Sequence, residues 1–518
     1  FINPGDYIYD AAKVLISDGT ASLVLVDQTD DDNASTGFGG GAHSSTVWDN
    51  SNNLLKLNPG NPPFDASGYF TSRIIDAGAS TSWSALSWTP QRPYYKELPD
   101  NAQSETAYPE GNADMTGNVL LMHMNEDNWN GAAGEVYDSS GSGNHGTAYN
   151  GVNTSAGGKF GRAGNFNGVS GYIKVPDSDS LDLTGPMTIT AWIYPRNAGG
   201  SNQGGIVSKN NGAVSGTGYK FSIDEGNCYT RSLMFNWSCS DPDVLTYNQW
   251  QHVAVVYDGI NAFFYVDAVP AGTDQPYPRA ANTLDIAIGS WFSSGAAKIF
   301  DGYIDEVAIY NRALTAQEII DSYVRGAVRL KYQARSCDDS ACDGENFSGP
   351  DGTSSTYYSE LSNSTADLPA DIPLFVTDSR YFQYKAYLET DNISYSPELK
   401  NVTIGPAHYP GDGPVVINNI GQTYIRLDTF TETLGEGNAG DIRYQISNNG
   451  GHWYYHDGIK WAPATAGFDH SNTASEVNVN MPVFRNYAVP GTFYFKAFLQ
   501  SDTYQQVELN RVSLSYVE

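Results

Sequence analysis

The sequence predicts an all-β protein built from β-sandwich domains, and three observations support this fold class. Aromatic residues make up 13% of the chain and charged residues only 17%, which is typical of β-rich proteins with polar surfaces. Large apolar and polar residues alternate over short stretches, as they do in half-buried strands. Clusters of Gly, Asn, Asp and Pro, such as residues 348–355, separate these stretches and predict turns.

One sandwich module occurs twice in the sequence. The segment YKAYLETD (384–391) returns as FKAFLQSD (495–502). Two further pairs of blocks match in the same order, 330–336 with 442–448 and 398–404 with 508–514. Matching blocks at nearly the same spacing indicate a repeated module, which we expect to be an antiparallel β-sandwich of roughly 110 residues.

The first copy of this module is interrupted by another domain. The second copy opens with residues 421–440, whereas the comparable stretch of the first copy, 72–90, lies more than 200 residues before its next block at 330. Domain insertion explains this gap, because a guest domain can occupy an exposed loop of its host. The predicted domains are a first sandwich (66–111 with 328–405), an inserted domain (112–327) and a second sandwich (406–518). The Pro- and Asn-rich stretch 90–114 is expected to be the entry linker.

Residues 1–65 are predicted to be an N-terminal β-segment. Residues 7–26 read as two strands around a turn at Asp18-Gly19, and residues 36–53 as a Gly-rich loop. This segment either extends the first sandwich or forms a small cap on it.

The inserted segment predicts a jelly roll. Its strands follow one another at short spacing, with Asp, Asn and Gly at the turns, and one short helix closes the segment. Thr315 and Glu318 form a T-x-x-E capping box before Ile319 and Ile320, which predicts the start of that helix.

The same segment resembles a known family. The motifs are DSSGSGNHGTA (138–148), FGRAGNFNGVSGYIKVP (160–176), MTITAWIYP (187–195), WQHVAVVYDG (250–259) and GYIDEVAIYNRALTAQEI (302–319). In this order they resemble the laminin-G-like, concanavalin-A-like jelly roll, over about 40% of the chain. The flanking sandwiches resemble modules that lie beside such domains in large secreted prokaryotic surface proteins. The resemblance implies a domain that binds carbohydrate or protein and often holds Ca²⁺.

The resemblance also implies a place for the metal. In the family the DSSGSGN loop and the GYIDEV strand lie together, which carries a calcium site onto Asp138, Asn144 and Asp305. Their carboxylate and amide oxygens, with nearby backbone carbonyls, are ligands that Ca²⁺ prefers. Such an ion would be structural or would bridge a ligand. The alternative is an ordinary Asx-turn capped by its own side chains.

Exposed aromatic residues near polar loops are the candidates for ligand binding, because sugar rings stack on aromatic faces. Tyr229 and Trp237 lie between Cys228 and Cys239, and Trp291 lies in GSWFSSG. A disulfide would stiffen the first of these loops and so favour binding. The alternative is that these side chains belong to the core, as we expect for Trp192 and Trp250.

The four cysteines form two close pairs, Cys228 with Cys239 and Cys337 with Cys342. The even count and the local pairing predict two disulfides and an oxidising compartment, hence an extracellular or cell-surface protein. A zinc site in CDDSAC (337–342) is the alternative, although no second cysteine pair or histidine lies nearby.

The charge balance limits the partners. Asp and Glu number 58 against 28 Lys and Arg, which gives a net charge of −30. This charge repels nucleic acid and anionic membranes and attracts divalent cations. No stretch approaches 18 consecutive apolar residues, so no membrane insertion is expected. Because the chain begins at Phe1, we interpret it as a mature, processed chain or a fragment.

Enzyme signatures are weak. The E-x-D-x-x-E pattern of related glycosidases is absent, and so are G-x-S-x-G and H-E-x-x-H. Asp305 and Glu306 are adjacent, so on a regular strand they would point to opposite faces and could not flank one glycosidic bond. His452 and His456 have a spacing that could hold a metal, but an aromatic hairpin is the favoured interpretation.

These observations predict a secreted, non-enzymatic protein for recognition or adhesion, whose jelly roll binds carbohydrate or a surface protein. The alternative is a structural subunit of an extracellular filament, a pilus-associated assembly or a surface layer. Such a subunit would assemble with itself or with a partner chain through edge strands.

Overall fold

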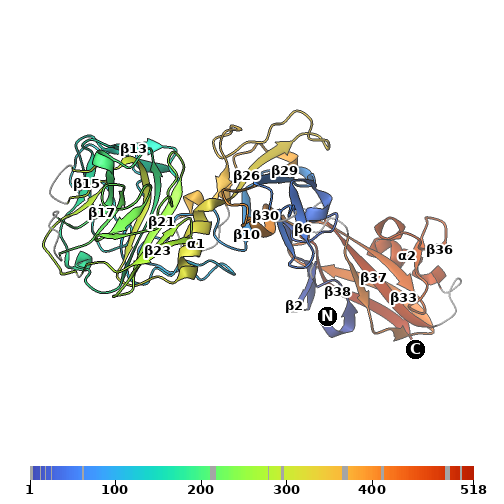
Figure 1. The fold of residues 1–518 in the computed structure, drawn as a ribbon. Coiled ribbons are helices and arrows are strands. Elements are labelled where there is room, and N and C mark those ends of the chain that lie inside the picture. Colours follow the sequence, from blue (N-terminus) through green and yellow to red (C-terminus); the bar gives the residue numbers. More distant parts are fainter. Residues whose placement is uncertain are drawn as a thin grey trace.

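Three β-sandwiches lie in a row in the computed structural model, with the jelly roll at one end and the second sandwich at the other (Figure 1). The structure describes residues 4–11, 13–17, 19–24, 26–60, 63–210, 217–277, 279–292, 297–363, 372–409, 413–484, 491–501 and 505–518. The predicted fold class is confirmed: a jelly roll is inserted into one β-sandwich and a related sandwich follows. Among the described residues, the helices are too short or too polar to cross a membrane.

Two sheets build the jelly roll. The junction sheet, which faces the first sandwich, contains β13 (Asn153–Ala156), β14 (Arg162–Asn167), β25 (Asp301–Tyr310), β16 (Met187–Pro195), β21 (Gln251–Tyr257), β22 (Ala262–Val266) and β23 (Val269–Asp274), with β11 (Asn118–Met122) beside β25. The far sheet contains β12 (Thr147–Tyr149), β15 (Tyr172–Val175), β24 (Ile286–Ile288), β17 (Gln203–Ser208), β18 (Lys220–Asp224), β19 (Leu233–Phe235) and β20 (Ser238–Cys239). Ile189, Phe221 and Ile304 pack in the core between the sheets.

Helix α1 (Ala316–Ala327) joins the jelly roll to the first sandwich. Its predicted capping box is present, because the Thr315 hydroxyl accepts from the Glu318 amide and the Glu318 carboxylate accepts from the Thr315 amide. The helix continues directly into strand β26 (Val328–Cys337) of the first sandwich. The two domains are therefore joined without a flexible segment on this side.

The first sandwich encloses an aromatic core. One sheet contains β28 (Ile372–Pro373), β10 (Ala85–Pro90), β30 (Glu398–His408), β7 (Leu54–Leu57) and β6 (Thr46–Asp49), with β4 (Val26–Asp30) beside β30. The other contains β27 (Tyr358–Ser359), β26, β29 (Ser379–Thr390), β8 (Ser67–Thr71) and β5 (Ala42–Ser44), with β9 (Ile75–Thr81) beside β29. The core continues into the jelly roll through Phe160, Trp192 and Tyr323. The two domains therefore share buried surface.

The two copies of the repeated module also pair their strands in the same register. Tyr332 of β26 lies opposite Ala386 of β29, and Tyr444 of β34 (Asp441–Ser447) lies opposite Ala497 of β37 (Thr492–Gln500). The second sandwich also contains β31 (Val415–Asn418), β32 (Gln422–Thr423), β33 (Arg426–Leu434), β35 (Tyr454–His456), β36 (Trp461–Pro463), β38 (Glu508–Val517) and helix α2 (Ala474–Phe484). Strand β10 pairs with β30 as β33 pairs with β38, so the stretch before the insertion completes the first copy.

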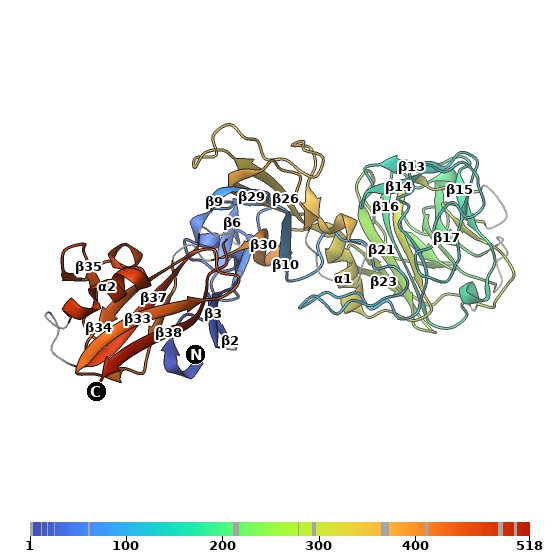
Figure 2. The ribbon, with the colours of Figure 1, turned by 180° about the vertical axis from the view of Figure 1, so that it is seen from behind.

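The N-terminal segment is divided between the two sandwiches. Strands β4 to β7 belong to the first sandwich, but β1 (Tyr7–Ile8) pairs with β31, and the hairpin of β2 (Val14–Ser17) and β3 (Thr20–Leu23) pairs with β38. We expected this segment to extend or cap the first sandwich only. Instead Val14, Ala21 and Leu23 fill the core of the second sandwich, and both chain ends lie on that side of the molecule (Figure 2).

The stretch 90–114, predicted to be the entry linker, is largely buried at residues 94–98. Tyr94, Lys96 and Glu97 are buried, because this stretch crosses between the junction sheet and the first sandwich. Lys96 donates to the Tyr108 hydroxyl, which in turn donates to Glu360. These hydrogen bonds satisfy polar groups that the stretch takes out of water.

Candidate functional site

Two of the predicted aromatic residues come together on the far sheet. The rings of Trp237 and Trp291 are 6.4 Å apart at 66°. The Lys220 ammonium lies 4.3 Å from the Trp237 ring and 3.7 Å from the Trp291 ring, and Lys298 lies 3.9 Å from Trp291. We name these four residues the lysine–tryptophan cluster. Because Trp291 is only 1% exposed and Trp237 is half-buried, Trp237 is the ring that this cluster offers to a ligand.

Local backbone geometry builds this cluster. Alternation along β18 points Phe221 into the core and Lys220 to the outer face of the sheet. Gly205 lets the loop of Trp291 cross this face, because a Cβ at position 205 would lie only 2.3 Å from the backbone nitrogen of Trp291. Burial lowers the pKa of Lys220 to about 7, although the Asp224 carboxylate opposes this shift.

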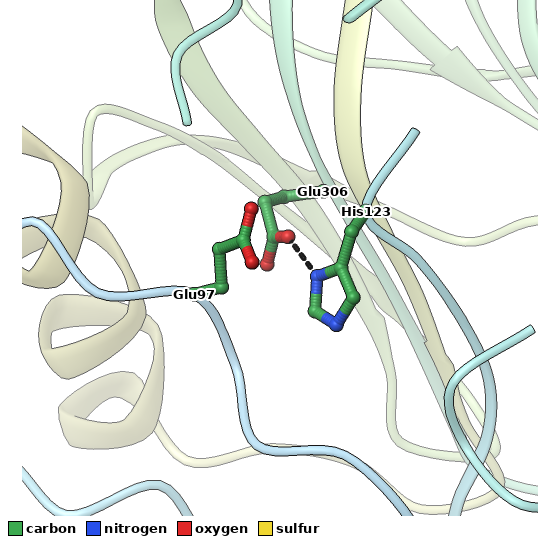
Figure 3. A group of neighbouring side chains, drawn as sticks. All are labelled: Glu97, His123 and Glu306. Atoms are coloured by element: carbon green, nitrogen blue, oxygen red, sulfur yellow. Dashed lines mark hydrogen bonds and ion pairs between the residues drawn. The ribbon is translucent and has the colours of Figure 1, made fainter. Parts of the chain in front are cut away.

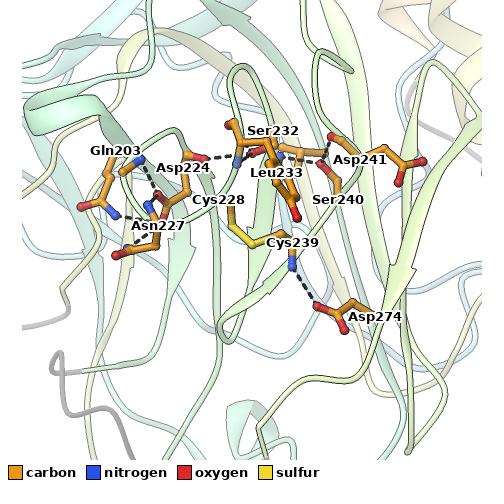
Figure 4. Close-up of a disulfide and its surroundings, with 12 residues drawn as sticks. Gln203, Asp224, Asn227, Cys228, Ser232, Leu233, Cys239, Ser240, Asp241 and Asp274 are labelled. Atoms are coloured by element: carbon orange, nitrogen blue, oxygen red, sulfur yellow. Dashed lines mark hydrogen bonds between the residues drawn. A yellow bond between two sulfur atoms is a disulfide. The ribbon is translucent and has the colours of Figure 1, made fainter.

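Tyr229 follows Cys228 in a separate loop between β18 and β19. The Cys228–Cys239 disulfide ties this loop to β20 (Figure 4). The Tyr229 side chain is 59% exposed, while its backbone amide donates to the Ser232 hydroxyl at 3.0 Å. The Cys239 amide donates to Asp274 of β23, which connects the disulfide to the neighbouring edge of the domain. Both predicted disulfides are present, Cys228–Cys239 and Cys337–Cys342.

The residues predicted to hold calcium make internal hydrogen bonds. Asp138 accepts four, from the amides of Leu121, Ser140 and Asn144 and from the Ser140 hydroxyl. These bonds use about all the acceptor positions of a carboxylate. The side-chain amide of Asn144 donates through Nδ2 to the Val119 carbonyl and the Ser180 hydroxyl. Asp138 and Asn144 therefore organise one loop, as the Asx-turn alternative describes.

Asp305 lies elsewhere, on the outer face of the junction sheet. Its carboxylate is fully buried and accepts from the amides of Phe160 and Glu306. Burial, with the nearby Glu306 carboxylate, raises its pKa well above the usual range. Within the described residues no hydrogen bond links Asp305 to the loop of Asp138. The calcium site at Asp138, Asn144 and Asp305 stays a prediction.

The expectation that Asp305 and Glu306 point to opposite faces is wrong. Opposite Ala191 of β16, strand β25 carries two residues, because the register passes from Ala308 directly to Asp305. Glu306 has a φ of 50°, which marks a β-bulge. Ile304 and Val307 point into the core, so both carboxylates face outward. Sequence alternation could not reveal this, because the bulge breaks the period of two.

The bulge brings Glu306 close to Glu97 and His123, three side chains of types that can ligate a metal (Figure 3). One potential ligand atom from each lies within 4.8 Å of the other two. His123 contacts Glu306 through Nδ1 and lies 3.1 Å from Asp100 through Nε2. Burial alone would lower the pKa of His123, but Glu306 and Asp100 raise it well above its usual value. Burial and Glu306 together raise the pKa of Glu97. The imidazolium therefore compensates Glu306, and Glu97 holds a proton more readily than a free carboxyl.

A pocket of about 500 Å³ opens between the jelly roll and the first sandwich. We name it the junction pocket; its lining includes Tyr95, Lys159, Trp250, Asp267, Arg329 and Asp391. Trp250 is half-buried and lines this pocket, which corrects the expectation that it is a core residue; Trp192 is buried, as expected. Sequence reasoning missed the pocket because its residues come from stretches that lie far apart in the chain, from Tyr95 to Asp391.

Comparison with known proteins assigns the inserted domain to a class. Residues 167–320 match the family described as the concanavalin A-like lectin/glucanases superfamily. This match confirms the predicted resemblance for the jelly roll. No curated protein matches the chain.

Several solved structures are similar to parts of this chain at low identity. Domain 4 of AbnA, a GH43 extracellular arabinanase from Geobacillus stearothermophilus in complex with arabinotriose, is 19% identical with a TM-score of 0.28, over 39% of this chain and 97% of that one. The CBM40 of a Ruminococcus gnavus IT-sialidase bound to alpha2,3 sialyllactose is 13% identical with a TM-score of 0.23, over 28% and 85%. A Trypanosoma rangeli sialidase is 15% identical with a TM-score of 0.31, over 43% of this chain and only 36% of its own length.

Proposed function

We propose that this chain is an extracellular, non-enzymatic recognition protein whose jelly roll binds carbohydrate. The observation that carries the proposal is the match of residues 167–320 to a family of lectins and glucanases. The two disulfides support an oxidising, extracellular location. In this proposal the two sandwiches present the jelly roll at one end of an elongated molecule (Figure 1).

Binding is favoured over hydrolysis by the burial of the carboxylates on the junction sheet. A glycosidase needs two carboxyl groups that flank a bound glycosidic bond. Asp305, Glu306 and Glu97 are 0%, 4% and 6% exposed. Because they are buried in the folded protein, Asp305 and Glu306 are not accessible to a sugar chain. These groups support the junction between the domains.

A glycan array tests the proposal with purified full-length protein, run once in Ca²⁺ and once in EDTA. Specific signal in both buffers supports carbohydrate binding without a metal. Signal that is lost in EDTA supports binding that depends on calcium. No signal in either buffer contradicts the proposal and favours the alternative, a structural subunit of an extracellular filament, pilus-associated assembly or surface layer.

A further inference from the structure

We propose that the junction pocket binds a neutral saccharide and that both the jelly roll and the first sandwich contact it. This inference rests on the proposed function and names its site and the class of its ligand. The pocket volume of about 500 Å³ lies in the range of roughly 300–1,000 Å³ that is usual for ligand pockets, which often form where domains meet.

Aromatic rings supply the stacking surface. Trp250 is half-buried and packs against Tyr194 and Tyr303, with ring centroids 5.8 and 6.2 Å away. On the other wall Tyr95 stacks on Phe160 at 5.9 Å. Both rings are held by neighbours yet remain partly accessible. Rings held in this way lose little conformational entropy when a sugar stacks on them.

The charges in the pocket balance, which favours a neutral ligand over an anionic one. The Lys159 ammonium lies 2.6 Å from one oxygen of Asp391, and the Arg329 guanidinium lies 2.7 Å from the other. Arg329 also contacts Glu389 at 2.9 Å. No cation of the described lining is left to pair with a sulfate or a sugar carboxylate. The Asp267 carboxylate, which also lines this pocket, would repel an anionic ligand.

The same polar groups can recognise hydroxyl groups. Asp391 keeps 42% of its side chain exposed, and each of its oxygens has acceptor capacity beyond one ion pair. Asp267 is fixed by hydrogen bonds from the His252 amide at 2.9 Å and from Gln251 at 3.3 Å. The exposed Gln249 amide offers both a donor and an acceptor. Sugar hydroxyls both donate and accept, so this set suits a saccharide.

The pocket is preformed because the junction is rigid. The Tyr95 amide donates to the Arg325 carbonyl at 2.8 Å, and the Asp391 amide donates to the Ala327 carbonyl at 2.8 Å. Tyr323 of α1 stacks on Trp192 at 5.8 Å. The end of α1 thereby holds both walls of the pocket in place. A preformed site avoids the cost of ordering its walls on binding.

The test uses the full chain on an array of neutral oligosaccharides (gluco-, manno-, galacto- and arabino-) and anionic ones (sialylated, sulfated and uronate). Titration with the best oligosaccharide then compares the wild type with four variants. Trp250→Ala and Asp391→Ala alter the pocket from its two domains. Trp237→Ala removes the half-buried ring of the lysine–tryptophan cluster, and Trp453→Ala removes a half-buried ring in the second sandwich. Circular dichroism and melting temperature confirm that each variant folds.

We expect a neutral oligosaccharide to bind, both pocket variants to weaken this binding by about tenfold or more, and the control variant Trp453→Ala to leave it unchanged. Trp237→Ala tests the lysine–tryptophan cluster as the competing site. Loss of binding in Trp237→Ala with Trp250→Ala unchanged would overturn the junction pocket and keep the proposed function. Binding of anionic oligosaccharides alone would overturn the ligand class. A wild type that binds no oligosaccharide would remove the proposed function itself.

Discussion

Arg325, at the end of helix α1, donates to the Glu105 carboxylate through both of its terminal nitrogens, and both side chains are buried. The pair joins the helix that leaves the jelly roll to the stretch that enters it. Glu105 also lies 3.1 Å from Lys96 and accepts from the Ala113 amide at 3.0 Å. The entry and the exit of the inserted domain are thus held together by one carboxylate.

Removing either partner of this pair should destabilise the junction strongly. Glu105→Gln leaves the buried Arg325 and Lys96 cations without this carboxylate, and Arg325→Met leaves Glu105 with Lys96 as its cation. Breaking a buried ion pair from one side costs about 3–5 kcal/mol. Hydrogen exchange of the α1 amides measures this loss as faster local opening. The double variant should lose less than the sum of the two single losses, because it removes both charges. Single losses below about 1 kcal/mol would show that the pair does not stabilise the junction.

Glu360 should make the protein less stable as the pH rises. Burial raises the pKa of this carboxyl from 4.5 to about 7, opposed by the Tyr108 hydroxyl and Lys96. Between these values the unfolded chain has lost a proton that the folded protein keeps, so folding becomes less favourable with increasing pH, by up to about 3 kcal/mol. Below pH 4.5 the whole contribution of Glu360 to the free energy of unfolding is present.

Calorimetry at pH 5 and pH 8 checks this sign. The melting temperature of the wild type should fall further between the two pH values than that of Glu360→Gln, which has no proton to lose. Glu436→Gln, at an exposed position in the second sandwich, should follow the wild type. An equal fall in the wild type and Glu360→Gln would show that Glu360 ionises normally in the folded state.

Gly326→Ala should destabilise the protein although it adds a better helix former. In an exposed helix this change stabilises by about 1 kcal/mol. Here the new Cβ would lie 2.5 Å from Cζ2 of Trp192 and 2.9 Å from Cζ of Phe160, and overpacking costs about 1–3 kcal/mol. The melting temperature should fall, whereas Gln317→Ala on the exposed face of α1 should leave it nearly unchanged. A higher melting temperature for Gly326→Ala would mean that α1 can move away from the sheet.

The Cys228–Cys239 disulfide should stabilise the jelly roll by about 3 kcal/mol, because it closes a loop with a sequence separation of 11 in the unfolded chain. Cys228→Ser/Cys239→Ser should lower the melting temperature and speed proteolysis near Tyr229. Cys337→Ser/Cys342→Ser is the comparison. Its separation is 5, so the expected loss is smaller, about 2 kcal/mol. A larger effect of the second pair would contradict the loop-closure explanation.

The local parts of this fold could be predicted from the sequence. The capping box at Thr315, the jelly-roll motifs and the repeated register of Tyr332 and Tyr444 all depend on neighbouring residues or on similarity between segments. Each leaves a pattern that can be read along the chain.

The remaining features depend on contacts that have no local pattern. The positive φ of Glu306 turns its carboxylate to the same face of the sheet as that of Asp305. The segment GYIDEV contains no sequence pattern that predicts this bulge. Polar composition at 90–114 suggested a linker, but tertiary contacts bury Lys96 and Glu97. The junction pocket needs Tyr95, Trp250 and Asp391 from distant stretches. Only the folded chain brings such residues together.

The N-terminal hairpin also constrains the order in which the molecule can form. The Thr20 hydroxyl donates to Asn510, a partner 490 residues away, and β3 pairs with β38. Closing so large a loop is slow, since distant segments must first find each other. During synthesis the hairpin emerges well before its partner strand β38, while the jelly roll and most of the first sandwich, which lie between them in the sequence, can already fold. The second sandwich is therefore completed only after β38 has emerged, later than the jelly roll and the first sandwich.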